Sequence, residues 1–452
     1  MPKRMGMRGT RRAAAAALAC AAALLMAGCF RTKIGIGRVS PHVSPTDTLE
    51  LRLVLIGDAG LPAPGGEPVM RGLHEELSRD PKHSFVVFLG DNVYPRGMVL
   101  DSTAAERREN ERIINAQLEP LLATGVKGIM IPGNHDWATG TAGGLEAVRT
   151  EGRYVKSRGR GLVEFLPEDG CPGPVVRDFG NYLRLIVLDT QWWLQEGSPR
   201  PEGPSSECRA KTEAEVIDSL AADLASAGPR RVVVVSHHPI VSGGQHGGYF
   251  DWPTYLFPFH PWARQSGLFA KQDVTGREYR ELIAGLSRAY RPHPPLVHAA
   301  GHEHNLQLLQ PRGAPVKYLV VSGAGIYDHT TPTRVIAGTM YARSVSGWVT
   351  LAFLRDGRVR MAYRVVDETG SFKEDYSIWL DVPPLIPVSE GSPTTPHEAQ
   401  PSGPTRPATP ADSPVPPPAP APPPAAPPVA PAPAPRPAPP PPPPPTPAGA
   451  HR

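Results

Sequence analysis

The chain has 452 residues, of which 58 are proline, and a formal net charge of +4. Five of its basic residues stand within the first 12 positions, so the rest of the chain is close to neutral. This balance gives no reason to expect a nucleic-acid partner or electrostatic binding to an acidic membrane surface.

Residues 1–29 have the features of an export signal: basic residues, an alanine-rich apolar run, and small residues before Cys29. The apolar run is too short for a permanent membrane span. Its end, Met26-Ala27-Gly28-Cys29, resembles the bacterial lipoprotein cleavage box with Met where Leu is usual, which implies a lipid on Cys29. A plain signal peptide cut nearby is the alternative. We expect an exported, membrane-anchored lipoprotein of a bacterial cell envelope, periplasmic or at the cell surface, with residues 30–49 as a linker.

Residues 50–382 have the composition of one folded domain, large but acceptable for an α/β enzyme. Apolar runs of strand length alternate there with segments of helical spacing, and such valine-, isoleucine- and leucine-rich strands predict sheets covered on both faces. The residues from 346 to 370 predict instead a β-hairpin that turns at Asp356-Gly357. Strands are expected at 51–57, 84–90, 127–134, 182–189, 231–238, 295–302 and 317–325, and helices at 69–79, 105–125 and 210–228.

Proline becomes frequent from about Pro383 and dominates residues 383–452. Because proline lacks a backbone N–H and holds φ near one value, this tail cannot form helices or sheets. We expect a disordered, semi-rigid polyproline II spacer. Docking of a cell-envelope or cell-wall partner is the alternative role.

Cys171 and Cys208 both lie in loops rich in proline, glycine and serine. In an exported protein these two cysteines could form a disulfide. Two separate thiols are the other possibility, and the sequence leaves both open.

Polar side chains follow the ends of several predicted strands. Open α/β sheets place ligand sites outside the carboxyl ends of their strands. One histidine at such a place would more often be an ordinary hydrogen-bonding residue. A set of carboxylate, phenol, amide and imidazole groups, however, predicts a metal site and not a nucleotide pocket. The seven candidate ligands are Asp58, Asp91, Tyr94, Asn134, His237, His302 and His304.

The stretches IGDAG, GDNVY, GNHD, VVSH and GHEH follow one another along the chain. They resemble the motifs of the calcineurin-like metallophosphoesterases and, among these, the purple acid phosphatases. The likeness covers nearly all of residues 50–370, and GHEHNLQLLQ and YLVVSGAG are most similar to the small tartrate-resistant branch. This resemblance implies an α/β fold: a four-layer α/β/β/α sandwich of two mixed β-sheets flanked by helices.

The same resemblance implies how two metal ions are held. Asp58, Asp91, Tyr94 and His304 would bind the first metal. Asp91, Asn134, His237 and His302 would bind the second, so that Asp91 bridges the two ions.

Most of the wider family has Asp-x-His in the first motif, with the histidine on the first metal. Here the position of that histidine is Gly60, and Tyr94 would take its place. A phenolate is a hard anionic donor that favours a trivalent ion, so we expect Fe(III) at the first site and Zn, Fe(II) or Mn at the second. The alternative for Tyr94 is a tyrosine packed at the rim of a site with fewer ligands.

Such a centre predicts an acid phosphatase that hydrolyses phosphate monoesters with a metal-activated hydroxide. His135 is a candidate general acid or phosphate contact. His246 matches an outer histidine of the resembled branch, with an exposed loop histidine as the alternative. Asp136 would orient His135 or a metal ligand. The alternative functions are a phosphodiesterase or pyrophosphatase with the same centre, and a non-catalytic surface binding module.

Residues 249–276, here called the insertion, are longer and more aromatic than the resembled branch suggests at this point. They predict either a wall over the site that selects the organic part of the substrate, or a satellite cluster or partner surface.

Overall fold

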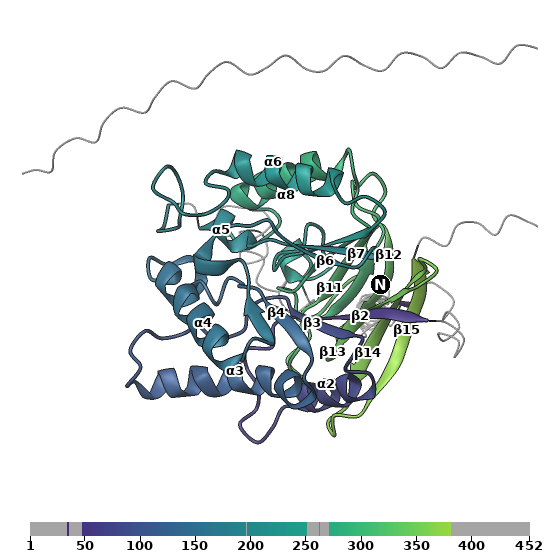
Figure 1. Cartoon of the computed structure of the whole chain (residues 1–452), viewed down its shortest axis with the longest axis horizontal. Helices are drawn as coiled ribbons and strands as arrows, with labels where there is room; N and C mark the ends of the chain where they lie inside the picture. The colour runs from purple at the N-terminus through teal and green to yellow at the C-terminus, as the bar shows by residue number, and fades with distance from the viewer. Residues whose placement is uncertain (1–33, 36–47, 196, 251–261, 263–270, 381–452) are drawn as a thin grey trace, which may run out of the picture. The chain divides into compact units, whose positions relative to one another are not determined.

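The computed structural model describes residues 34–35, 48–195, 197–250, 262 and 271–380 (Figure 1). The expected signal and the proline-rich tail lie outside the described residues, as do most of the linker and residues 251–261 and 263–270 of the insertion.

Two mixed β-sheets make up the centre of the described chain. In sheet A, β7, β8, β9 and β11 run parallel to one another, and the other pairings are antiparallel. Its strands are, in order, β1 (Ile34–Gly35), β12 (Thr339–Arg343), β10 (Leu306–Leu309), β11 (Tyr318–Ser322), β9 (Val297–Ala300), β8 (Arg231–Val235), β7 (Leu183–Val187) and β6 (Val175–Phe179).

Sheet B has a parallel half and an antiparallel half. Strands β2 to β5 are parallel, while β13, β14 and β15 pair antiparallel. In order, the strands are β15 (Phe372–Leu380), β14 (Val359–Val366), β13 (Gly347–Leu354), β2 (Leu49–Ile56), β3 (Ser84–Phe88), β4 (Lys127–Met130) and β5 (Val163–Phe165).

Helices cover the outer side of each sheet and complete the four layers (Figure 1). One group is α2 (Pro68–Arg79), α3 (Ala105–Thr124) and α4 (Gly144–Arg158). The other is α5 (Thr190–Leu194), α6 (Glu213–Ala225) and α8 (Arg277–Tyr290). Among the described residues, no helix has the length and apolar character that a bilayer crossing requires.

Alternate residues of the central strands face two different parts of the core. Leu53 and Leu55 of β2 pack with Val233 of β8 in the layer between the sheets. Val54 and Ile56 point the other way, into the cluster that includes the helices. Because both faces of these strands are buried, their sequences are apolar throughout and do not alternate with polar residues.

The helix ends follow local chemical rules. Gly125 ends α3 in the left-handed conformation, with φ 72°, as the sequence predicts. Thr212 accepts a hydrogen bond from the backbone of Glu215, whose carboxylate in turn accepts one from the N–H of Lys211, so α6 begins with reciprocal caps.

Each strand and helix expected from the sequence is present, including the β13–β14 hairpin, but the expected bounds are too long at β4, which ends at Met130 and not at residue 134. Cys171 and Cys208 form a disulfide with their Cα atoms 5.5 Å apart, which decides the alternative that the sequence left open.

Candidate metal centre

The seven side chains expected to bind metal lie together at the carboxyl ends of strands from both sheets. Sheet B contributes the residues after β2, β3 and β4, and sheet A contributes those after β8 and β9. The site therefore lies across the edge where the two sheets meet.

Four of these side chains form a first group around the phenol of Tyr94. Its Oη lies 3.2 Å from Asp58 Oδ1, 3.1 Å from Asp91 Oδ2 and 3.0 Å from His304 Nε2. His304 Nε2 is also 3.4 Å from Asp58 Oδ1. These are the four residues expected at the first metal, brought to one point.

A second group surrounds the side-chain oxygen of Asn134. His237 Nε2 and His302 Nδ1 each lie 3.0 Å from Asn134 Oδ1, and 3.2 Å from each other. Asp91 Oδ1 lies 3.4 Å from His237 Nε2. The two oxygens of Asp91 thus face the two groups separately, as a bridging carboxylate would.

The orientation of both histidine rings in the second group suits metal binding. His237 Nδ1 lies 2.8 Å from Leu89 O, and His302 Nε2 lies 2.8 Å from Gln272 O. A carbonyl oxygen only accepts, so these nitrogens carry the proton and the opposite nitrogen of a neutral ring presents a lone pair. The lone pairs of the two nitrogens and the Asn134 oxygen then face one another. A cation between these three atoms would remove their mutual repulsion.

The charges of the site also favour a cation. Burial lowers the pKa of His237, but the Asp91 and Asp58 carboxylates and the bond to Leu89 O together raise it to about 9. Without a metal the ring therefore keeps a second proton, a positive charge that a metal ion would replace. Burial and the carboxylates of Asp91 and Asp58 raise the pKa of Tyr94 well above its ordinary value. Burial, helped by neighbouring histidines, lowers the pKa of His302 and keeps that ring neutral. The donor set therefore fits two metal ions.

Three of the candidate ligands have a strained backbone. Asp58, Asp91 and His302 adopt positive φ values of 56°, 56° and 68°. Side chains other than glycine rarely adopt this region, and such residues concentrate at functional sites.

Gly60, in the position of the missing histidine, has no space for any side chain. A Cβ there would lie 2.6 Å from backbone atoms of Asp91, Asn92 and Val93. The Gly60 carbonyl accepts the backbone N–H of Tyr94 at 3.1 Å. The close packing that excludes a histidine at Gly60 is the same packing that positions Tyr94.

Asp136 lies directly beneath the site. Its buried carboxylate accepts the backbone N–H groups of Asn92 at 2.9 Å, Val93 at 3.0 Å and Gly133 at 2.7 Å. Burial, with a contribution from Asp91, raises the pKa of Asp136 to about 7. It therefore holds the backbone of the two loops that carry Asp91 and Asn134.

His135 lies beside the first group with 27% of its side chain exposed. Its Nδ1 bonds Pro95 O at 2.6 Å, its Nε2 is 3.9 Å from Asp91 Oδ2, and its ring centre is 4.4 Å from that of Tyr94. This is a position from which an imidazole can contact a substrate.

His246 lies beside the second group, with its ring centre 3.9 Å from that of His302. Its backbone N–H donates to Glu303 Oε1 at 2.9 Å. The same oxygen accepts the Ser242 hydroxyl at 2.8 Å and the Gly247 N–H at 3.2 Å. Buried Glu303 thus fixes the glycine-rich loop over the site.

Four further residues around the centre were not expected from the sequence as part of the site: Gln272, Asp273, Glu303 and His329. Glu303 stands between the two histidines of GHEH, which was the available signal. The ring of His329 lies 4.7 Å from that of His304, but it comes from a loop with no motif.

His238 belongs geometrically to a cluster with His237 and His302 whose ligand atoms lie within 4.8 Å of one another. Both of its ring nitrogens already have protein partners, Thr190 Oγ1 and Gln272 Oε1, each at 2.8 Å. We therefore place it behind the ligands as a hydrogen-bonding residue.

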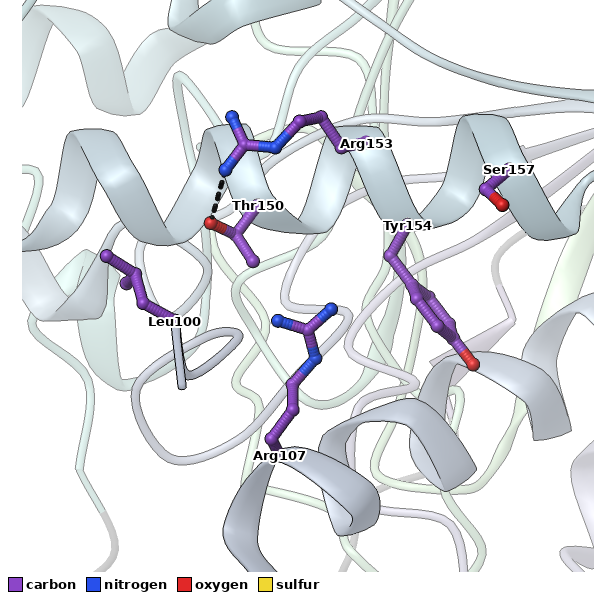
Figure 2. Close-up of a pocket in the computed structure, with 6 residues that line it drawn as sticks. All are labelled: Leu100, Arg107, Thr150, Arg153, Tyr154 and Ser157. Carbon is purple, nitrogen blue, oxygen red and sulfur yellow. Dashed lines mark hydrogen bonds between the residues drawn. The ribbon is translucent and has the colours of Figure 1, made fainter. Parts of the chain in front are cut away.

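A separate pocket of about 470 Å³ lies between α3 and α4, away from all seven candidate ligands (Figure 2). Arg107 reaches into it from α3, but its guanidinium bonds Glu111 at 3.0 Å and Val99 O at 2.8 Å. Arg153 of α4 donates to Thr150 Oγ1 at 2.8 Å. These contacts do not resemble a catalytic site.

Three solved structures that match the chain share little sequence with it. GAP50, the anchor in the inner membrane complex of Plasmodium, is 14% identical over 74% of this chain and 89% of its own, with a TM-score of 0.47. Purple acid phosphatase PPD1 from yellow lupin seeds is 16% identical over 73% of this chain and 53% of its own, at 0.47. A 5'-nucleotidase precursor from Thermus thermophilus is 14% identical over 73% of this chain and 54% of its own, at 0.28.

No curated protein matches the chain. A family model described as calcineurin-like phosphoesterase matches residues 51–306, more than half of the sequence. The matched residues contain most of β2, all of β3, β4, β8 and β9, and all seven candidate metal ligands. The chain belongs to the calcineurin-like phosphoesterase family.

Proposed function

We propose that this phosphoesterase is an acid phosphatase that hydrolyses phosphate monoesters at a centre of one Fe(III) and one divalent ion. The observation that carries the proposal is the position of the Tyr94 hydroxyl, within 3.2 Å of Asp58, Asp91 and His304. The five motifs that resemble purple acid phosphatases support it.

The tyrosine favours a trivalent ion for an electrostatic reason. Burial and two carboxylates raise the pKa of Tyr94, so the phenol holds its proton unless a strong positive charge lies next to the oxygen. A trivalent ion provides more of that charge than a divalent one. The neutral donors Asn134, His237 and His302 of the second group suit Zn, Fe(II) or Mn.

When bound, two metal ions would neutralise the phosphate oxygens and make hydroxide available from water below neutral pH. The chain's own residues complete the site. His135 and His246 lie beside the first and second groups, where they can contact the phosphate or give a proton to the leaving oxygen. Asp136 and Glu303 hold the loops that carry these groups.

The absorption spectrum and metal content of the purified protein test the first site. We expect a visible phenolate-to-iron band that Tyr94→Phe abolishes. Tyr182→Phe should leave it unchanged, because Tyr182 precedes β7 and so lies at the end of that strand opposite the carboxyl edge that carries the ligands. A colourless protein with only divalent ions would contradict the Fe(III) proposal.

Rates on p-nitrophenyl phosphate and on its bis-ester test the reaction. We expect the monoester to be the better substrate, and Asp91→Ala, which removes the bridging carboxylate, to reduce the rate to background. A faster reaction with the bis-ester would favour the phosphodiesterase alternative. Turnover that survives Asp91→Ala would exclude the centre as the catalyst.

We also propose that the protein is an exported lipoprotein acylated at Cys29. The Cys171–Cys208 disulfide supports an oxidising compartment. Fractionation tests this: Cys29→Ser should move the protein from the membrane to the soluble fraction, and an unchanged distribution would contradict the lipid anchor.

A further inference from the structure

The last residues of the insertion pack against the second group of ligands. The carbonyl of Gln272 accepts from His302 Nε2, and its side-chain oxygen bonds His238 Nε2, both at 2.8 Å. The next residue, Asp273, places Oδ1 2.8 Å from His246 Nδ1. The N–H of Val274 donates to His246 O at 2.9 Å. Two successive side chains of the insertion thus support the centre.

We propose that Asp273 is a positioning residue that holds His246 for proton transfer to the leaving oxygen of the substrate. This inference rests on the proposed phosphatase function and adds to it a part for the insertion. The pairing of Asp273 with His246 supplies a carboxylate and an imidazole next to the metal ligand His302.

The geometry restrains the His246 ring from three directions. Asp273 is buried, with 2% of its surface exposed, and as a carboxylate it accepts the Nδ1 proton. His302 lies against the face of the ring, with the two ring planes inclined at 36°. Glu303 holds the backbone N–H. When the ring is the imidazolium, with Nδ1–H on the Asp273 carboxylate, Nε2–H is the group that would give a proton to a substrate. Of the His246 side chain, 19% remains exposed to solvent.

The reaction gives this donor a defined task. Water adds its oxygen to phosphorus while the bond from phosphorus to the ester oxygen breaks and leaves its electron pair on that oxygen. A proton from His246 Nε2 turns the leaving oxygen into an alcohol, and the proton of the attacking water restores the histidine. An alkoxide needs this proton in the transition state, whereas a nitrophenolate leaves well without it.

Two substrates with different leaving groups therefore test the proposal. We expect Asp273→Asn to lower kcat on glycerol phosphate by about 10²-fold, and on p-nitrophenyl phosphate by less than about threefold, with KM nearly unchanged. His246→Gln should show the same selectivity, and Asp273→Glu should recover part of the lost rate. Asp356→Asn, in the distant hairpin turn, is the matched control and should have no effect.

Metal analysis of each variant separates positioning from structural damage. All variants should contain as much metal as the wild type. Equal losses on both substrates, loss of metal in Asp273→Asn, or a His246→Gln variant without leaving-group selectivity would overturn the proposal. If Asp273→Asn does not fold, the rates of His246→Gln and Asp273→Glu on the two esters test the proposal in its place. A wild type that hydrolyses neither ester would refute the proposed function itself.

Discussion

Gly60 and Tyr94 are a pair of residues whose identities depend on each other. The backbone of residues 91–93 passes so close to Gly60 that no Cβ fits, and the same segment carries the phenol into the first group of ligands. A histidine at Gly60 and a ligand at Tyr94 are therefore alternatives in this backbone. This mutual exclusion supports the hypothesis that Tyr94 replaces the usual histidine as a metal ligand.

This dependence leads to a prediction for Gly60→Ala. The added methyl group would meet backbone atoms at 2.6 Å, so the loop must shift and carry Tyr94 with it. We expect a loss of about 1–3 kcal/mol in the free energy of unfolding and a weaker visible band. Gly65→Ala, where nothing lies within 4 Å of the new Cβ, is the control. Equal stability of the two variants would show that the loop adapts at no cost.

At the scale of elements, the parallel strands explain why the candidate ligands could be predicted from the sequence. Asp58, Asp91, Asn134, His237 and His302 each follow an apolar strand, and parallel strands bring such positions to one edge. Their supporting residues could not be found in this way. Gln272 and Asp273 reach the centre only because the end of the insertion folds back before α8, and no local pattern encodes that path.

Three of the elements that were not expected from the sequence lack the apolar signal of the long central strands. Helix α4 has the sequence GLEAVRTEGRYVKSR, in which few apolar residues mark the buried side. Strand β5 has only three residues, and edge strand β15 has polar residues that resemble a loop. Long central strands such as β2 are recognisable because both faces are buried, and these three elements lack that signal.

Asp189 links the start of α5 to Trp137 in the loop after β4. Its burial should make the stability of the protein depend on pH. It caps α5 by accepting the N–H of Trp192 at 3.1 Å, and it accepts Trp137 Nε1 at 2.8 Å. Burial raises the pKa of Asp189 to about 7, above its value in the unfolded chain. The stability that this group contributes is therefore complete below about pH 4 and is lost as pH rises through about 7.

Asp189→Asn keeps the size of the side chain and one of its two acceptor oxygens but cannot ionise, so it should remove this pH dependence. The free energy of unfolding of the wild type minus that of the variant should fall as pH rises from about 4 to about 7. Urea unfolding at several pH values measures the difference. A difference that stays constant over this range, or one that rises with pH, would contradict the assigned pKa shift.

At the scale of the whole described domain, the centre depends on how the two sheets pack. Sheet B supplies Asp58, Asp91, Tyr94 and Asn134, and sheet A supplies His237, His302 and His304. The apolar layer between the sheets, with residues such as Leu55, Val87, Val233 and Ala299, fixes the relative position of the two halves. Loss of that packing would separate the ligands, so metal release and unfolding should occur together.

The Cys171–Cys208 disulfide closes a loop between residues 37 positions apart that includes strands β6 and β7 of sheet A and helix α5. In the chain-entropy description a loop of this length stabilises the folded state by about 4 kcal/mol, because it restricts the unfolded chain. We expect the double variant Cys171→Ser/Cys208→Ser to have a free energy of unfolding lower by about that amount, and so to unfold at a lower urea concentration, while its metal content and visible band stay unchanged.

Reduction provides the internal control for this prediction. A thiol reductant should bring the wild type to the stability of the double variant and should leave the double variant as it was. If both proteins unfold at the same urea concentration before reduction, the disulfide either does not form or does not restrict the unfolded chain. A count of free thiols on the unreduced protein separates these two cases, because a formed bridge leaves neither Cys171 nor Cys208 reactive.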